Sequence, residues 1–200
     1  METKERIISE SIQLFIHRGV RSVNMDEISS QLGISKKTLY QYFSNKQELV
    51  FVAFEHLLLK MRKLLNEKTS IEKNAIDELF EMDDEMYKLV KQISIPLVIE
   101  LKKYYRDTWN LVDQFKKTFL FDIISQNINK GIEQGLFLDS IKVDFIAKIY
   151  ISRSENLVDV AYFSNGKFDF KEVLLQYRIY HLRGISTLKG LEYLEKKLTK

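Results

Sequence analysis

The amino-acid sequence predicts an all-α fold, because it holds few residues that break helices and because its apolar residues recur at helical spacing. Glycine (7) and proline (1) supply 8 of the 200 residues, or 4%, against about 12% in an average protein. Hydrophobic residues make up 45% and charged residues 30% of the chain, which is typical of amphipathic helices. A β-sandwich would need many more turn residues.

The composition also excludes several classes of protein and of site. The chain has no cysteine, so it has no disulfide scaffold, no thiolate zinc site and no cysteine nucleophile. Lys and Arg (31) exceed Asp and Glu (28) by only three, so the net charge alone indicates no partner. The longest apolar run, Leu49–Phe54, is far shorter than the ~18 residues that cross a bilayer, and no apolar segment of a signal peptide follows the start. We therefore expect a cytoplasmic protein without a membrane partner.

The first fifty residues predict three short helices and the start of a longer one. Gly19 and Gly33 stand where a left-handed residue ends a helix, and Asn24 and Ser35 stand where a side-chain oxygen caps the next one. The predicted helices cover residues 3–18, 25–32, 36–43 and, from a capping box at Ser44–Gln47, a stretch that reaches Asn66. Two helices joined by a tight turn with glycine, here Leu32–Ser35, form a helix-turn-helix.

The third predicted helix presents hydrogen-bonding side chains to the solvent. Wound at 100° per residue, it directs Leu39 and Phe43 toward a small core. The opposite side has Lys37, Thr38 and Gln41 at its centre and Lys36, Tyr40 and Tyr42 at its flanks. Lys and Gln side chains can bind phosphates and read base edges in the major groove, and Ser35 places the helix N-terminus where a phosphate can approach.

The charge around this helix is locally basic. Residues 28–47 include three lysines and no acidic residue, although the whole chain is nearly neutral, and a basic stretch with this geometry favours DNA. An ordinary solvated helix with Tyr40 and Tyr42 half-buried is the alternative.

A longer pattern includes this helix. It runs Leu32-Gly-Ile-Ser-Lys-Lys-Thr-Leu-Tyr-Gln-Tyr-Phe43, after Ile7-Ile8, Ser11, Leu14-Phe15, Gly19 and Asn24-Met-Asp-Glu-Ile28 and before Asn45-Lys46-Gln-Glu-Leu49. Over residues 3–52 the chain resembles the tetracycline-repressor (TetR/AcrR) family of bacterial regulators. The resemblance implies a helix-turn-helix DNA-binding head over residues 1–48 and a helical body over residues 49–200 that binds an effector and forms dimers.

The resemblance also implies roles for single residues. The side chains in the major groove would be Lys36, Lys37, Thr38, Tyr40 and Gln41. Tyr42 and Lys46 would bind phosphates, and Asn24 would lie near a phosphate at the start of the second helix. Lys37 stands where many relatives have a small residue or glycine, which indicates a different base preference.

The rest of the chain predicts a larger helical body. Its helices are expected over residues 69–92, 95–104, 107–131, 142–163 and 169–198. Pro96 falls in the first turn of the second of these, where its missing N–H is harmless, and Asn165-Gly166 predicts a turn between the last two. Gly131–Phe137 resembles the family's turn after its long seventh helix.

Aromatic residues gather in the middle of the chain, and an effector pocket needs apolar walls with a few polar groups. The candidate pocket residues are Tyr104, Tyr105, Trp109, Phe115, Phe119, Tyr150 and Arg153. Because aromatic residues at helical spacing are more often core, packing inside the body is the alternative for each. The fourth helix continues from the head into the body, and we expect an effector to act through it as a lever.

The last predicted helix carries one apolar stripe that fits the family's dimerising helix pair. The candidate interface residues are Leu174, Tyr177, His181, Gly184, Ile185 and Leu188. Among them, Gly184 would let a second helix approach closely. The alternative is that the stripe packs only inside one subunit.

Nothing in the sequence predicts catalysis, a metal site or a cofactor. The three histidines, at positions 17, 56 and 181, form no metal-binding or catalytic motif. The prediction is therefore a homodimeric DNA-binding regulator, usually a repressor, which a small-molecule effector releases from a palindromic DNA operator. A helical ligand-binding or enzymatic body with a non-regulatory head, and a DNA-binding protein of chromosome organisation, are the other interpretations.

Overall fold

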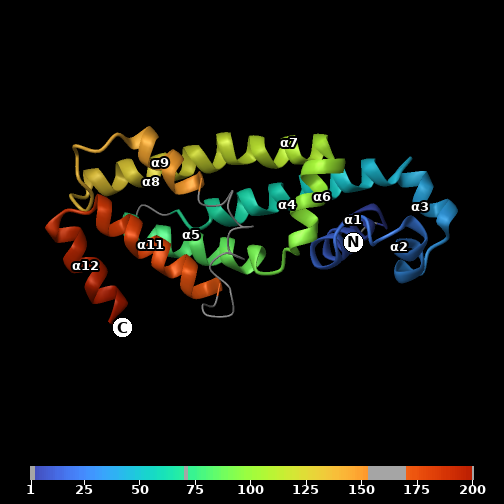
Figure 1. Ribbon diagram of the computed structural model, residues 1–200, viewed down its shortest axis with the longest axis horizontal. Helices are drawn as coiled ribbons and strands as arrows, with labels where there is room; N and C mark the ends of the chain where they lie inside the picture. Colours follow the sequence, from blue (N-terminus) through green and yellow to red (C-terminus); the bar gives the residue numbers. More distant parts are fainter. Residues whose placement is uncertain (1–2, 70–71, 153–169, 200) are drawn as a thin grey trace. The chain divides into compact units, whose positions relative to one another are not determined.

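A computed structural model describes residues 3–69, 72–152 and 170–199, and these residues form an all-α protein (Figure 1). The chain divides into two compact units, one drawn from residues up to Lys63 and from Gln92–Phe115, the other from Leu64–Lys91 and from Lys116 onward. The predicted functional boundary after residue 48 falls inside α4 (Lys46–Asn66), which is one continuous helix. Within the described ranges, no helix is both long and apolar enough to cross a bilayer.

The first unit holds the predicted head. Its helices are α1 (Thr3–Arg18), α2 (Met25–Leu32), α3 (Lys36–Tyr42), most of α4, α6 (Ile95–Tyr104) and α7 (Arg106–Phe115). The bounds of α1, α2 and α6 confirm the predicted ones, α4 ends at the predicted Asn66, and α3 ends one residue early. Between α2 and α3, Gly33 has a φ of 64°, which glycine adopts without strain.

Side-chain caps fix the starts of α2 and α3, as predicted. Asn24 Oδ1 accepts a hydrogen bond from the Glu27 N–H at 2.8 Å. Ser35 Oγ accepts one from the Thr38 N–H at 3.0 Å. Each bond satisfies a backbone donor that the first turn of a helix leaves without a partner.

The predicted cap of α4 is wrong by one residue. Asn45 rather than Ser44 caps the helix, because Asn45 Oδ1 accepts the N–H of Glu48 at 2.9 Å. The Glu48 carboxylate then accepts the N–H and the hydroxyl of Ser44 at 2.7 and 2.6 Å. These bonds from Ser44 lower the pKa of Glu48, and Glu48 takes the place that Gln47 was expected to fill.

A small apolar core holds α1 to α4 together. Its fully buried side chains include Ile7, Phe15, Ile16, Ile28, Leu39, Phe43 and Leu49. The end of α1 is also bound to α6, because the Ser94 N–H donates to the Ile16 carbonyl and the Arg21 N–H donates to Glu100 Oε2, both at 2.9 Å. The head is therefore fixed against α6 within this unit.

The second unit is a helical body. Its elements are α5 (Ala75–Val90), a π-helical turn η1 (Lys116–Leu120), α8 (Phe121–Glu133), α9 (Val143–Ser152), α11 (Phe170–Ile185) and α12 (Leu188–Leu198). In this unit α8 packs on α5 and α9, and α11 packs on α5 and α12 (Figure 1). The Asp77 carboxylate of α5 accepts hydrogen bonds from Lys197 (2.7 Å) and Tyr193 (2.5 Å) of α12, which binds the last helix to the body.

Several predicted bounds in the body are wrong. The helix expected from residue 69 begins at Ala75, because the Thr69 hydroxyl donates back to the Asn66 carbonyl at 2.8 Å and Asn74 Oδ1 accepts the Asp77 N–H at 2.9 Å. The π-helical turn interrupts the helix expected over 107–131. The expected end of a helix at Phe163, the Asn165-Gly166 turn and the Asp169 cap lie outside the described residues.

The helix predicted over residues 169–198 is in fact two helices, α11 and α12. Thr187 starts the second one, since its Oγ1 accepts the Gly190 N–H at 3.2 Å. The Thr187 N–H donates to the Leu136 carbonyl at 2.9 Å, and Ser186 pairs with Phe137 in an isolated β-bridge. The helix therefore breaks where the turn after α8 binds its backbone.

Two glycines allow this turn to pack closely. At Gly131 a Cβ atom would lie 2.0 Å from Phe137 Cδ2, and at Gly190 it would lie 2.1 Å from the Leu136 carbonyl oxygen. Both distances are far below van der Waals contact, so a side chain at either position forces its neighbour to move. The turn that follows α8 thus needs glycine on both sides.

Candidate nucleic-acid interface

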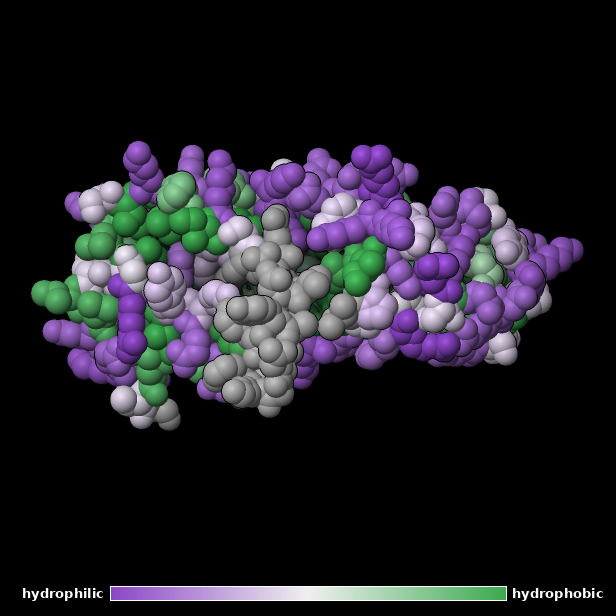
Figure 2. All heavy atoms as spheres, viewed as in Figure 1, coloured by the Kyte–Doolittle hydropathy of each residue, from purple (hydrophilic) through white to green (hydrophobic). Residues whose placement is uncertain are grey.

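Two buried side chains anchor α3 and leave its other residues at the surface. Leu39 and Phe43 are buried in the core of the head, as their spacing predicted. The remaining side chains are exposed or half-buried, namely those of Lys36, Lys37, Thr38, Tyr40, Gln41 and Tyr42. Figure 2 shows a mostly hydrophilic surface at this end of the unit. The structure thus gathers the predicted groove residues, together with Tyr42, on the solvent side of one short helix.

The hydroxyl groups of Ser35 and Thr38 form a hydrogen bond with each other at the start of α3. Ser35 Oγ and Thr38 Oγ1 lie 2.8 Å apart, and the first turn carries no acidic residue. An α-helix with its side chains is about 10–12 Å in diameter. It therefore fits a major groove about 12 Å wide.

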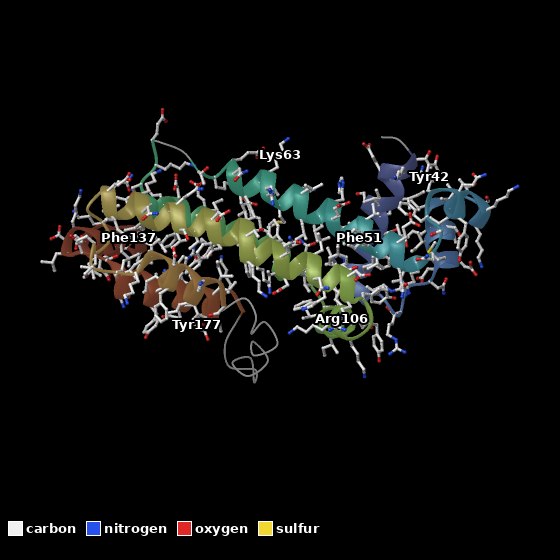
Figure 3. All side chains as sticks on the ribbon, turned by 90° about the horizontal axis from the view of Figure 1, so that it is seen from above. Tyr42, Phe51, Lys63, Arg106, Phe137 and Tyr177 are labelled. Carbon is white, nitrogen blue, oxygen red and sulfur yellow. The ribbon has the colours of Figure 1, made fainter. Side chains whose placement is uncertain are left out.

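Tyr40 and Tyr42 lie at the surface of the head. Their side chains are 43% and 39% exposed, which is more than a structural role in the core would leave. In Figure 3, Tyr42 lies among side chains that end in nitrogen and oxygen atoms. The surface around α3 consequently offers donors from several residues at once.

One ion pair in this surface was not predicted. Lys36 Nζ lies 2.6 Å from Asp26 Oδ1, and the hydrogen bond and negative charge of Asp26 raise the pKa of Lys36. Asp26 precedes the acid-free stretch of residues 28–47, so a count within that stretch missed it. Of the two lysines of α3, Lys37 has no ion-pair partner within the described ranges.

Two further predicted contacts lie at the starts of neighbouring helices. Asn24 is exposed, and because its Oδ1 caps α2, its amide nitrogen is the donor left for a ligand. Lys46 is half-buried in the first turn of α4. Burial lowers the pKa of Lys46, and the charges of Glu100 and Glu27 act in the opposite direction.

The predicted pocket residues are divided between the two units. Tyr104, Tyr105, Trp109 and Phe115 belong to the first unit, Phe119 and Tyr150 belong to the second, and Arg153 lies outside the described residues. Tyr104 packs against the Arg21 guanidinium group, 4.8 Å from the ring centre, and Trp109 lies 4.8 Å from Lys102 Nζ. Tyr150 is buried and donates to Asp83 at 2.6 Å. Several of these aromatic rings therefore have partners of their own.

A polar cavity of about 500 Å³ opens in the second unit. Its walls include Glu78, Asn127 and Lys130, where Lys130 donates to Glu78 at 2.6 Å and Asn127 donates to it at 3.2 Å. None of the predicted pocket residues lines it. No local sequence pattern indicates this cavity, because its polar residues come from two helices far apart in the chain.

The predicted interface residues of the last helix differ in exposure. Ile185 is buried in the subunit's own core, Leu174 and His181 are half-buried, and Tyr177, Gly184 and Leu188 are exposed. Apolar side chains that were not predicted join them at the surface, namely Phe145 (62% exposed), Ile149 (48%) and Tyr180 (81%). Figure 2 shows hydrophobic side chains at the surface over α9.

Comparison with known proteins identifies the family. A family model described as bacterial regulatory proteins, tetR family, matches residues 7–53. Over 173 residues the chain is 28% identical to the uncharacterized HTH-type transcriptional regulator YvaF of Bacillus subtilis (strain 168). This alignment covers 85% of this chain and 88% of YvaF.

Solved structures share the fold. The reduced form of E. coli NemR matches with a TM-score of 0.75 at 19% identity, over 94% of this chain and 98% of that one. The SmeT–triclosan complex matches with a TM-score of 0.69 at 13% identity, over 93% and 92% of the two chains.

The matched segment coincides with the geometry described above. Residues 7–53 comprise most of α1, the whole of α2 and α3, and the first turns of α4. These elements position the exposed side of α3. The sequence relative, which is named as an HTH-type transcriptional regulator, aligns with this chain over most of its own length. Residues 7–53 therefore form the DNA-binding segment of the tetR family of bacterial regulatory proteins, and the protein is a DNA-binding transcriptional regulator.

Proposed function

We propose that this regulator is a homodimeric repressor, which binds a palindromic operator through α3 and leaves it when a small molecule binds. The observation that carries the proposal is the solvent side of α3. There, Lys37, Tyr40 and Gln41 are exposed while Leu39 and Phe43 hold the helix in the core.

The side chains of α3 and its neighbours divide into two roles. Gln41 can bind adenine with two hydrogen bonds, and Lys37 can bind guanine or a phosphate. Tyr42 and Lys46 would bind phosphates, as would the helix N-terminus capped by Ser35, and such contacts set register without reading sequence. Sequence preference then depends on Gln41 and Lys37.

Exposed apolar side chains support the homodimer. Phe145 and Ile149 project from α9, Tyr177 and Tyr180 from α11, and Leu188 is 80% exposed at the start of α12. The rings of Tyr150 and His181 lie 4.5 Å apart, so α9 and α11 are neighbours. A second copy of the chain would remove these side chains from water, and a two-fold dimer would present two heads to a palindrome.

The effector is proposed from the family. The related SmeT structure is a complex with triclosan, which is consistent with an apolar small molecule acting on proteins of this fold. Aromatic residues such as Tyr105 and Trp109 of the first unit are our candidates for its walls. The continuous helix α4 starts at Lys46 and would carry a shift at the effector's site to the head.

Selection of bound sequences from random duplex DNA with the purified full-length protein tests the proposal. We expect an enriched palindrome with half-sites about one helical turn apart or slightly more, and a dimer mass by analytical ultracentrifugation. An enriched site without a dyad, or a monomeric mass on DNA, would contradict the homodimer. Failure to enrich any sequence would contradict base reading by α3.

A further inference from the structure

An acidic side chain lies beside the lysines that are proposed to face DNA. Asp26, in the first turn of α2, places its carboxylate 2.6 Å from Lys36 Nζ. Both side chains are on the outer surface, with exposed fractions of 65% for Asp26 and 56% for Lys36. The pair therefore bridges α2 and α3 at the surface of the head.

This ion pair contributes little to the stability of the fold. Exposed ion pairs contribute little to stability, because both charges are well hydrated without each other. The start of α2 is capped by Asn24 and carries a second acid, Glu27, in the same turn. The main effect of Asp26 is therefore on the charge of the surface that is proposed to contact DNA.

A lysine held by a carboxylate is a weaker phosphate ligand than one without such a partner. To bind a phosphate, Lys36 must leave Asp26 and give up the attraction between the two charges. Binding to arbitrary sequences comes almost wholly from lysine and arginine contacts with phosphates. Lys37, with no ion-pair partner among the described residues, has no such restraint.

We propose that Asp26 is a positioning residue that holds Lys36 and so restrains the binding of the head to DNA phosphates of any sequence. The proposal rests on the contact of α3 with DNA that was proposed above. It gives the two adjacent lysines of α3 different roles, since Lys37 is available to DNA and Lys36 is withheld from it.

The probe is a labelled 30-base-pair duplex of random sequence, titrated with the full-length protein by fluorescence anisotropy at several salt concentrations. For Asp26→Asn we expect binding about two- to five-fold tighter per head at low salt. The slope of log K against log salt should steepen by about 0.9 for each phosphate that Lys36 gains. Asp26→Glu, which keeps the carboxylate, should behave like the wild type.

Three controls separate this role from others. Glu10→Gln makes the same change in net charge on an exposed position of α1, and it should leave the slope unchanged. In a Lys36→Met background, Asp26→Asn should have no effect. Lys37→Met should flatten the slope by about 0.9 per head, whereas Lys36→Met should change it much less.

Each of the other results overturns the proposal. A gain for Asp26→Asn that persists without Lys36 would mean that the carboxylate repels DNA directly. Equal effects of Glu10→Gln and Asp26→Asn would mean that only net charge matters. Equal losses for Lys36→Met and Lys37→Met would show that Lys36 is not withheld, and this comparison holds even if Asp26→Asn fails to fold. If the wild type binds neither the random duplex nor a selected site, the proposed function itself fails.

Discussion

Replacing Gly131 by alanine should destabilise the body, although alanine is ordinarily the better residue inside a helix. Where a methyl group has room, this substitution stabilises a helix by about 0.5–1 kcal/mol. Gly131 has no such room, since a Cβ atom would lie 2.0 Å from Cδ2 and 2.3 Å from Cε2 of Phe137. Phe137 is only 2% exposed, so its ring cannot move aside without leaving the core.

The magnitude follows from two opposing effects. Overpacking of a core costs about 1–3 kcal/mol, and the better helix propensity of alanine offsets up to about 1 kcal/mol of it. We therefore expect Gly131→Ala to lower the free energy of unfolding by about 1–2 kcal/mol, which corresponds to a fall in Tm of roughly 2–8 °C for a chain of this length. Urea denaturation followed by circular dichroism and a thermal scan would measure both quantities.

The chain offers a matched control and a rescue. Gly184 is also a helical glycine, but a Cβ atom there would meet no neighbouring side chain or distant backbone of the subunit within 4 Å. Gly184→Ala should therefore leave the stability of the subunit itself unchanged or slightly raised. Shortening the ring with Phe137→Leu should reduce the additional cost of Gly131→Ala. Equal stability of Gly131→Ala and the wild type would refute the close packing of α8 on the turn that follows it.

The Asp77 carboxylate should make the protein less stable in acid. Burial alone would raise the pKa of Asp77, but the hydrogen bonds from Lys197 and its other donors outweigh burial and lower it. A pKa that is lowered in the folded state stabilises that state fully above the unfolded value near 4, and this contribution is lost as the pH falls below about 4. Asp77→Asn should therefore flatten that part of the pH dependence of the free energy of unfolding, measured by urea titrations. Tyr42→Phe and Lys46→Ala should weaken binding to all duplexes by similar factors, measured by anisotropy, because their contacts are with phosphates. Leu188→Glu should shift the dimer toward monomer in analytical ultracentrifugation, because it places a charge in the proposed interface.

Each of these outcomes has a result that contradicts it. The same loss of stability in acid for Asp77→Asn and the wild type would assign no role to the bonds between α5 and α12. A change of preferred sequence in Tyr42→Phe would mean that its hydroxyl reads bases. Ile185 is the control for the dimer, because it is buried within the subunit: Ile185→Glu should unfold the protein, whereas Leu188→Glu should leave a folded monomer.

The head could be predicted from the sequence because its signals are local. Asn24 and Ser35 each cap a helix through a residue three positions later, and Gly33 ends α2 by its own conformation. The exposed side of α3 follows from the spacing of Leu39 and Phe43 alone. Even the error at the start of α4 is a shift of one residue, from Ser44 to Asn45.

The body could not be predicted as well, because its helix ends depend on residues far apart in the chain. The break between α11 and α12 exists because Thr187 binds the carbonyl of Leu136, some fifty positions earlier. The apolar residues keep their helical spacing across the break, so the sequence gives no sign of it. The ion pair between Asp26 and Lys36 was missed for a related reason, since the two residues meet only when α2 and α3 pack. The polar cavity beside Glu78 likewise needs two helices to be placed together.

Base reading by α3 is tested most directly by repeating the sequence selection with Gln41→Ala beside the wild type. We predict that the variant still enriches a palindrome but loses its preference at the same position of both half-sites, where a good bidentate contact is worth about 1–3 kcal/mol. All other positions should keep their preference. An unchanged selected sequence with uniformly weaker binding would contradict base reading by Gln41.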